Sequence, residues 1–235
     1  MKIGIIVATH IPTIQHHNAL LTRCIDSLNS QTRSADEVIF VINGFYEPTF
    51  DKLVESIKKS YKGEHKVILV NRKCGCGPAR NIGVNNLSED IEYFGLLDVD
   101  DRYHEQKLEL QEKRLKVKPV DVLGTLHYDV DIHGKISDSA AVPGTLVTSD
   151  KIAAALRSRN VVCGASVLIK KKMFLDLGMF EENLIPGTVW PQYGKRMWED
   201  WDMWQRVTNA GYKIENMDDR LYYWFSGLSV SREFK

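Results

Sequence analysis

The feature that most constrains the fold of this chain is a threefold alternation of strand-like and helix-like stretches near its start. Residues 3–8, 37–42 and 66–70 are apolar and rich in β-branched side chains, as expected for strands buried on both faces of a parallel sheet. Between these runs, apolar residues recur at helical spacing, first over 18–28 and then over 50–61. This alternation predicts an α/β fold with a Rossmann-like, mostly parallel central sheet and helices on both faces.

A fourth strand-like run, residues 93–97, ends in three acids, Asp98, Asp100 and Asp101. Residues two apart in an extended chain share a face, so Asp98 and Asp100 can direct their carboxylates at one point. Such oxygen ligands suit Mg²⁺ or Mn²⁺, although a solvated turn after a buried strand explains the same pattern. Ligands of these sheets bind beyond the carboxyl ends of the strands. Polar residues that fall at those ends favour a binding site there: Thr9, Asn43, Arg72 and Asp98.

Composition and charge favour an ordinary globular protein without a strongly basic surface, although a local basic patch stays possible. The chain has 235 residues, of which 43% are hydrophobic, and its 31 basic side chains balance 31 acidic ones. A formal net charge of zero provides no overall basic field to attract nucleic acid. No stretch approaches 18 apolar residues, and the first run is too short for a signal peptide, so we expect a cytoplasmic protein. Cys74-Gly-Cys76 lacks the spacing of common zinc knuckles, so reduced thiols are expected.

The second half of the chain is less regular, and no linker or repeat divides it from the first, which predicts one domain. The pattern predicts, in chain order, a helix over 104–117, a strand over 120–128, a hairpin turn at His133-Gly134, an apolar strand over 161–169, a long loop over 183–198, and short strands over 213–217 and 221–225. A loop as long as 183–198 typically forms a lid or a binding surface.

A second acidic cluster, Glu199 and Asp200, stands among tryptophans at the start of a predicted helix. The helix dipole favours carboxylates in the first turn, which is a sufficient structural explanation. Aromatic walls also raise the pKa of a carboxyl group and can make it a general base. Both interpretations are open from these residues alone. Aromatic side chains near the cluster suit an acceptor surface: Trp190, Tyr193, Trp198 and Trp201.

Taken together, these segments resemble the family-two glycosyltransferases, nucleotide-sugar-dependent enzymes of the GT-A fold. The resemblance covers nearly the whole chain, and the order and spacing of its motifs make it specific. The segments that carry it are Ile5-Ile-Val-Ala-Thr9, residues 21–32, Gly77-Pro-Ala-Arg80-Asn81-Ile-Gly83, Phe94-Gly-Leu-Leu-Asp98-Val-Asp100-Asp101, Val162-Cys-Gly-Ala-Ser, Leu177-Gly178-Met-Phe180-Glu-Glu, and Glu199-Asp200-Trp201-Asp202 through Gly211-Tyr212.

The resemblance implies a nucleotide-sugar-binding half, residues 1–103, and an acceptor-binding half, residues 104–235, of the same single domain. On the donor side, Asp98 is implied to contact the ribose or the metal, and Asp100 to coordinate Mn²⁺ or Mg²⁺ at the diphosphate. Asp101 either assists or is a plain turn residue. Thr9 is implied to line the nucleobase pocket and Arg80 to lie near the nucleotide. On the acceptor side, Asp200 is implied to be the base that deprotonates the acceptor hydroxyl in an inverting reaction, with Glu199 orienting it.

One departure concerns the donor. The family usually has Asp-Asp-Gly-Ser after the second strand, where this chain has Ile42-Asn43-Gly44-Phe45, so only the Asn43 amide remains to contact the base. A UDP-sugar is therefore the favoured donor rather than an established one. The expected acceptor is a glycan or lipid-linked sugar, and less so a hydroxylated DNA base. Two alternatives are a sugar nucleotidyltransferase and a non-catalytic saccharide-binding protein. The C-terminal segment with Arg232 either closes over the cleft or is a frayed tail.

Overall fold

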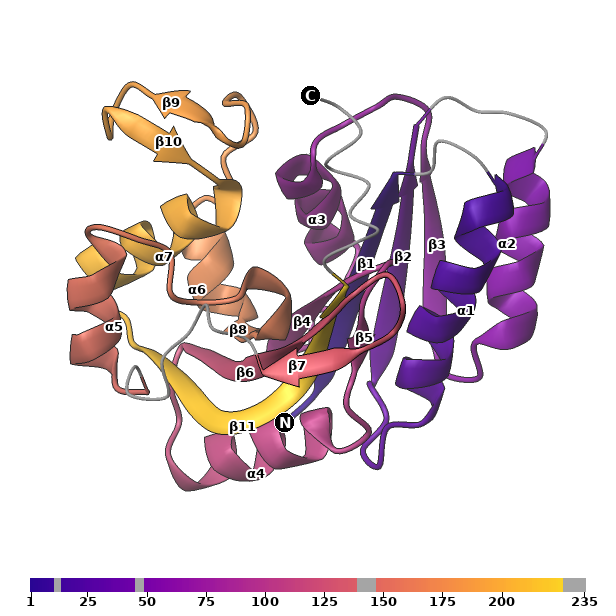
Figure 1. Ribbon diagram of the computed structural model, residues 1–235, viewed down its shortest axis with the longest axis horizontal. Helices are drawn as coiled ribbons and strands as arrows, with labels where there is room; N and C mark the ends of the chain where they lie inside the picture. Colours follow the sequence, from indigo (N-terminus) through magenta and orange to yellow (C-terminus); the bar gives the residue numbers. More distant parts are fainter. Residues whose placement is uncertain (11–13, 45–48, 139–146, 226–235) are drawn as a thin grey trace.

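The computed structural model of the chain describes residues 1–10, 14–44, 49–138 and 147–225. Within these ranges one nine-stranded sheet forms the centre of the molecule, and a separate two-stranded sheet stands apart from it at the upper left of Figure 1. No helix in the described ranges is long and apolar enough to cross a membrane. Arg232 lies outside the described residues.

The first half of the sheet contains the predicted parallel strands. β1 (Ile3–His10) lies between β2 (Glu37–Asn43) and β4 (Tyr93–Asp98), and β3 (His65–Val70) lies beyond β2. All three pairings are parallel, so the carboxyl ends of these strands lie at one edge of the sheet. The register confirms that this edge brings together the ends of strands that carry Thr9, Asn43 and Asp98.

The second half of the sheet is mixed. β8 (Leu168–Lys170) runs antiparallel between β4 and β6 (Val122–Val130), and β11 (Ile214–Phe225) is parallel to β6. β5 (Arg102–Tyr103) is antiparallel to β11. β7 (Ile136–Asp138) pairs with β6 in the expected hairpin, which turns at Gly134 with a φ of 78°. Because β4 pairs with β8, the sheet continues without a break from the first half of the chain into the second.

Three local predictions for the second half are wrong. Residues 161–169 do not form one strand: a 3₁₀ turn, η1 (Gly164–Ser166), precedes β8, because the Ser166 hydroxyl bonds nearby backbone groups instead of leaving them to a ladder. The expected loop over 183–198 contains a hairpin of β9 (Thr188–Trp190) and β10 (Lys195–Met197). The two expected C-terminal strands are one strand, β11. Its pairing with β6 shifts in register between Asn216 and Tyr222, and these shifts accommodate the polar residues there without ending the strand.

Helices cover both faces of the sheet, as predicted. Successive residues of β1 point to opposite faces, so Ile5 packs in one core and Ile6 in the other. Gly83 lets its helix lie directly on β1, because a Cβ there would overlap Ile6. The first core includes α1 (Ile14–Asn29), α2 (Thr49–Ser60) and α4 (Lys107–Val117), and the second includes α3 (Cys76–Asn85), α5 (Ser149–Leu156), α6 (Lys171–Asp176) and α7 (Glu199–Asn209).

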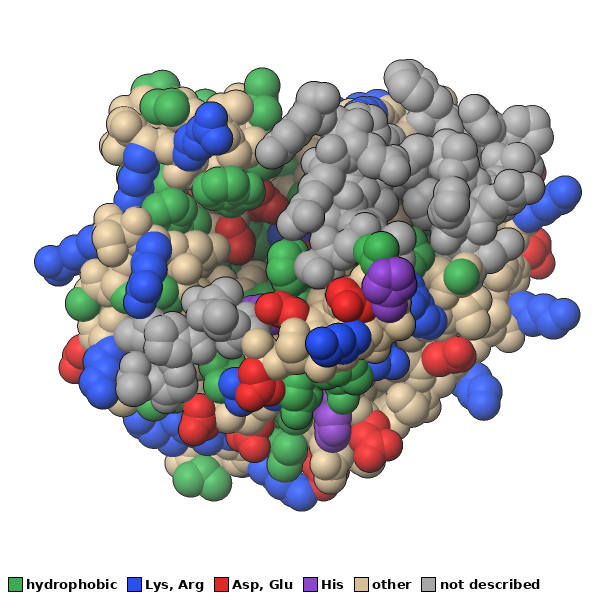
Figure 2. All heavy atoms as spheres, viewed as in Figure 1, with side chains coloured by type: hydrophobic (Ala, Val, Ile, Leu, Met, Phe, Trp, Pro, Cys, Tyr) green, Lys and Arg blue, Asp and Glu red, His purple; other side chains and the backbone are tan. Residues whose placement is uncertain are grey.

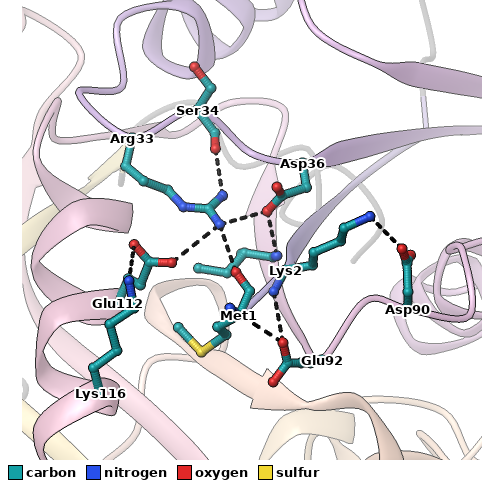
Figure 3. Close-up of polar contacts among 10 residues, drawn as sticks. Met1, Lys2, Arg33, Ser34, Asp36, Asp90, Glu92, Glu112 and Lys116 are labelled. Carbon is teal, nitrogen blue, oxygen red and sulfur yellow. Dashed lines mark hydrogen bonds and ion pairs between the residues drawn. The ribbon is translucent and has the colours of Figure 1, made fainter.

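A network of ion pairs and hydrogen bonds fixes the amino-terminal end of β1 (Figure 3). The Arg33 guanidinium donates to the Met1 carbonyl at 3.1 Å and pairs with Asp36 at 2.6 Å and Glu112 at 3.5 Å. Asp36 in turn accepts a hydrogen bond from the backbone N–H of Ile3 at 2.7 Å. These contacts tie α4 and the segment before β2 to the start of β1, at the opposite end of that strand from Thr9.

Candidate active site

The residues expected to form the site come from the carboxyl ends of the parallel strands, from α3 and from the first turn of α7. Figure 2 shows acidic side chains in a hollow beside the lobe that carries β9 and β10. The carboxyl end of β4 carries Asp98, while α7 begins with Glu199 and Asp200. Asp98 is about a hundred positions from the adjacent Glu199 and Asp200, so the two groups depend on tertiary contacts to meet.

Arg80 makes the contact that joins these carboxylates. Its Nη2 donates to Asp98 Oδ1 at 2.8 Å, and its Nη1 donates to Glu199 Oε1 at 3.2 Å. The Arg80 side chain is only 7% exposed, so both charge-assisted bonds lie in a largely dehydrated setting. The end of β4 and the first turn of α7 are thus held by one guanidinium group on α3.

The three acids after β4 have two different roles. Asp98 and Asp100 are partly exposed, whereas Asp101 is buried and accepts hydrogen bonds from the Tyr222 hydroxyl and from the backbone N–H of Phe225 at 2.8 Å. Asp101 therefore attaches the end of β11 to the acidic turn. The sequence left open whether Asp101 assists in binding or is a turn residue. Both of its carboxylate oxygens are used in structural hydrogen bonds, which favours the structural role.

The chemistry of Asp98 and Asp100 fits a divalent cation held together with a ligand. Burial and the neighbouring Asp98 carboxylate raise the pKa of Asp100 to about 7, because two negative charges held close together and away from water are unfavourable. No group of three or more Asp, Glu, His or Cys side chains in the described part of the chain is arranged to hold a metal. Two carboxylates without a full protein cage match the usual Mg²⁺ site, which is completed by substrate phosphates and water.

Asp200, the predicted base, is held by two hydrogen bonds. Its Oδ2 accepts a hydrogen bond from the Asn160 amide at 2.9 Å, and its Oδ1 accepts one from the backbone N–H of Trp201 at 2.7 Å. Burial and the adjacent Glu199 carboxylate raise the pKa of Asp200 to about 7, while Arg80 and the two hydrogen bonds oppose that rise. Gly164 leaves the room that Asp200 occupies, because a Cβ at that position would lie 3.0 Å from its Oδ2.

The orientation of α7 is set by contacts with the segment between α6 and β9. The Arg206 guanidinium pairs with Asp202 at 2.7 Å and also donates to the carbonyls of Leu177 and Met179. The Asn81 side chain donates to the Phe180 carbonyl at 2.9 Å and accepts from its N–H at 3.0 Å. This segment therefore links α7 to α3, and it keeps Glu199 within reach of Arg80.

Thr9 and Asn43, the predicted nucleobase residues, lie side by side at the ends of β1 and β2. The Asn43 amide donates to the Thr9 carbonyl at 2.9 Å and accepts from the Cys74 N–H at 3.2 Å. Asn43 thereby holds the segment before α3 against the strand ends. Its contact with a base stays a prediction.

The predicted acceptor aromatics separate into core and surface residues. Trp190 is fully buried and donates to the Ile185 carbonyl, and Trp201 is 7% exposed and donates to the Leu156 carbonyl. The half-buried Tyr193 donates its hydroxyl to Asp202 at 2.8 Å. Trp198 is 47% exposed and directly precedes Glu199, so of the four it presents the most ring surface to solvent.

Sequence reasoning missed three residues that shape the site. Asn81 lies within the Ala-Arg-Asn segment, so its place in a motif was a signal for it. Gly164 likewise lies within the Val162-Cys-Gly-Ala-Ser segment, whereas Asn160 carried no signal, because only the folded chain brings the segment after α5 against the first turn of α7.

Comparisons with known proteins agree with this geometry. The family model "Glycosyl transferase family 2" matches residues 9–176. An uncharacterized glycosyltransferase of Rickettsia bellii is 30% identical over 207 residues, which are 86% of this chain and 27% of that protein. The amylovoran biosynthesis glycosyltransferase AmsE of Erwinia amylovora is 23% identical over 204 residues, covering 86% of this chain and 68% of that protein.

A solved structure shows the same fold. The crystal structure of S. aureus TarS 1-349 in complex with UDP-GlcNAc superposes with a TM-score of 0.70 at 16% identity, covering all of this chain and 61% of that one. This likeness confirms the expected GT-A type α/β fold. The chain spans about a quarter of the length of the Rickettsia bellii protein and about three fifths of the solved TarS chain. The matched family model and the shared fold agree with the motifs: the chain belongs to glycosyl transferase family 2.

Proposed function

We propose that this chain is a metal-dependent, inverting glycosyltransferase that moves a sugar from a UDP-sugar to an acceptor hydroxyl. The family supports glycosyl transfer, and the TarS structures with UDP and UDP-GlcNAc support a UDP-sugar donor on this fold. Residues 1–103 bind the donor in this proposal, and residues 104–235 bind the acceptor.

The observation that carries the proposal is the Arg80 bridge between Asp98 and Glu199. A donor held by the acidic turn and an acceptor held beside α7 must meet for sugar transfer. One buried guanidinium that contacts both elements supports a single reaction site rather than two unrelated acidic clusters.

On the donor side, Asp98 and Asp100 hold Mg²⁺ or Mn²⁺ together with the diphosphate, and Thr9 and Asn43 face the nucleobase. When bound, the metal ion offsets the negative charge that develops on the departing UDP. Arg80 keeps the Asp98 carboxylate in place from α3. The protein's own contribution is a pair of carboxylates, of which Asp98 is held in place by the Arg80 guanidinium.

On the acceptor side, Asp200 accepts the proton of the attacking hydroxyl. Its pKa of about 7 suits a general base near neutral pH, since the group is ionised when needed yet basic enough to take a proton. The bonds from Asn160 and the Trp201 N–H aim its carboxylate. Attack from the face opposite the leaving UDP inverts the anomeric carbon, as in inverting glycosidases that use a carboxylate base. Trp198 offers a ring surface to a glycan or lipid-linked sugar acceptor.

A panel of UDP-, GDP- and dTDP-sugars tests the proposal by thermal shift and by release of nucleoside diphosphate, with Mn²⁺ or with a chelator. We expect a UDP-sugar to raise the melting temperature only when metal is present, because a ligand bound to the folded state stabilises it. Asp200→Asn should lower turnover by roughly 100-fold or more while the UDP-sugar still binds. Asp100→Asn should weaken metal-dependent binding itself. Asp150→Asn, an exposed acid on α5, is the matched control and should change neither.

Three results separate the alternatives. Full turnover by Asp200→Asn would show that another group is the base. Pyrophosphate release from a nucleoside triphosphate and a sugar phosphate would indicate a nucleotidyltransferase. Saccharide binding without turnover of any donor, with a range of sugar acceptors present, would indicate a binding protein.

A further inference from the structure

Arg80 differs from the other site residues because its guanidinium is already engaged by two carboxylates. The Nη2–Asp98 bond of 2.8 Å and the Nη1–Glu199 bond of 3.2 Å use different nitrogens of one planar group. A lysine at this position would present a single point of charge and could not hold two separated carboxylates in a fixed geometry. The forked guanidinium group of Arg80 is therefore suited to hold the end of β4 and the start of α7 at the same time.

The helix that carries Arg80 is itself fixed close to α7. A Cβ on Gly77 would lie 3.2 Å from the Phe180 Cβ and 3.4 Å from Glu199, so the start of α3 packs directly on both. Asn81 makes two hydrogen bonds to the Phe180 backbone. Arg80 is thus not a flexible surface arm, and its charge stays at one place between the two carboxylates.

The same charge acts on Asp200. The ionisable groups that face Asp200 are Glu199 from its own helix, Arg80 and Cys76 from α3, and Cys163 from the segment before η1. Burial raises the pKa of the Cys163 thiol to about 12, so this group stays neutral near pH 7, while Cys76 is a solvent-exposed thiol. Among these groups Arg80 is the only cation, and it opposes the effects of burial and of Glu199 on Asp200.

We propose that Arg80 is a positioning residue that couples the two sides of the site: its planar guanidinium holds Asp98 and Glu199 in one arrangement, and its charge favours the ionised form of Asp200. This inference extends the proposed function, in which Asp200 is the base. The pKa of Asp200 then depends on a residue that Asp200 does not touch, and the donor and acceptor sides share one structural link.

The test compares Arg80→Gln, Arg80→Lys and Glu199→Gln by two measurements. The first is the protonation midpoint of Asp200, followed by ¹³C NMR of the labelled carboxyl groups and assigned with Asp200→Asn. The second is the pH dependence of kcat/KM for transfer. Arg80→Gln should move the midpoint upward by about one pH unit or more, because an opposite charge has been removed. Glu199→Gln should move it downward, because a like charge has been removed.

Arg80→Lys separates charge from geometry. It should leave the midpoint near that of the wild type, since the positive charge remains, but lower kcat by roughly tenfold or more because the fork is lost. Arg196→Gln is the matched control: it removes an exposed arginine of β10, and it should not move the Asp200 midpoint. If Arg80→Gln fails to fold, the opposite shift of Glu199→Gln and the unshifted midpoint of Arg80→Lys still test the coupling.

An unchanged midpoint in Arg80→Gln, or an equal shift in Arg80→Lys, would overturn the inference. The NMR titration needs neither donor nor acceptor, so it is independent of the proposed function. If the wild type transfers no sugar while the predicted midpoint shifts appear, the electrostatic link stands and the proposed reaction fails. If transfer occurs without the shifts, the reaction stands and the role given to Arg80 fails.

Discussion

Lys107 offers a sharp test of the packing and electrostatics of this fold. Its side chain, in the first turn of α4, is fully buried, and its ammonium group donates to Gln111 Oε1 at 2.7 Å and lies 4.2 Å from the centre of the Tyr103 ring. It forms no ion pair with a carboxylate of the described residues. Burial lowers the pKa of Lys107 from 10.5 to about 7, since removal from water penalises the charged form.

The lowered pKa has a defined effect on stability. Between pH 7 and 10.5 the unfolded chain binds a proton at this lysine and the folded chain largely does not, so the free energy of unfolding rises with pH through this window. Below pH 7 the cost of the buried lysine is fully present. From pH 7 to pH 9 the wild type should therefore gain about 2 kcal/mol relative to Lys107→Met, which lacks the titrating group.

Urea unfolding of both proteins at pH 7 and pH 9 measures this gain. At pH 7 we expect Lys107→Met to be more stable than the wild type by roughly 1–3 kcal/mol, because the variant does not bury a charge. The loss of the hydrogen bond to Gln111 Oε1 offsets part of this gain. At pH 9 the two should be nearly equal. Cys163, the nearby thiol, has a pKa raised to about 12 and does not titrate in this range. Lys113→Met, which removes an exposed lysine of α4, should show no such pH dependence. A stability difference that is the same at both pH values would refute the reasoning.

Three further predictions concern the site and its supports. The rate of transfer should rise about tenfold from pH 6 to pH 8 with a midpoint near 7, as Asp200 ionises, and a kcat/KM profile that is flat over this range would contradict its role as base. Asp101→Ala should lower the free energy of unfolding by roughly 2–4 kcal/mol, because it leaves the buried Tyr222 hydroxyl without its acceptor, and chemical denaturation would measure this. Gly83→Ala should cost about 1–3 kcal/mol, since the new methyl group overlaps Ile6, and an unchanged melting temperature would show that α3 can shift away from β1.

The sequence by itself determined the first half of the fold. The strands β1, β2, β3 and β4 are apolar runs with long amphipathic or glycine-marked segments between them, and such local patterns are sufficient to predict strand, helix and order. Because parallel strands place their carboxyl ends together, the order also predicted where Thr9, Asn43 and Asp98 would meet.

Local patterns failed where the outcome depended on a distant partner. The apolar stretch over 161–169 has strand character, yet hydrogen bonds of Ser166 with Cys163 and Thr125 hold part of it in a 3₁₀ turn. β11 continues through a polar interruption because β6 lies beside it along much of its length. Trp190 looks like a loop aromatic in the sequence and is a core residue in the fold, since its hairpin folds back on α7.

The sequence shows which acidic residues can bind a metal or accept a proton. Only the tertiary structure decides which of them lie together in one site. Asp98, Asp100 and Asp200 were recognisable as candidates because carboxylates at a strand end and a helix start suit metal binding and proton transfer. Contacts between distant segments bring these carboxylates into one site. Arg80 bonds to Glu199, 119 positions away, and Asn160 bonds to Asp200, 40 positions away. A hydrogen bond requires its two atoms to approach within about 3 Å, and no local pattern specifies such proximity between distant segments.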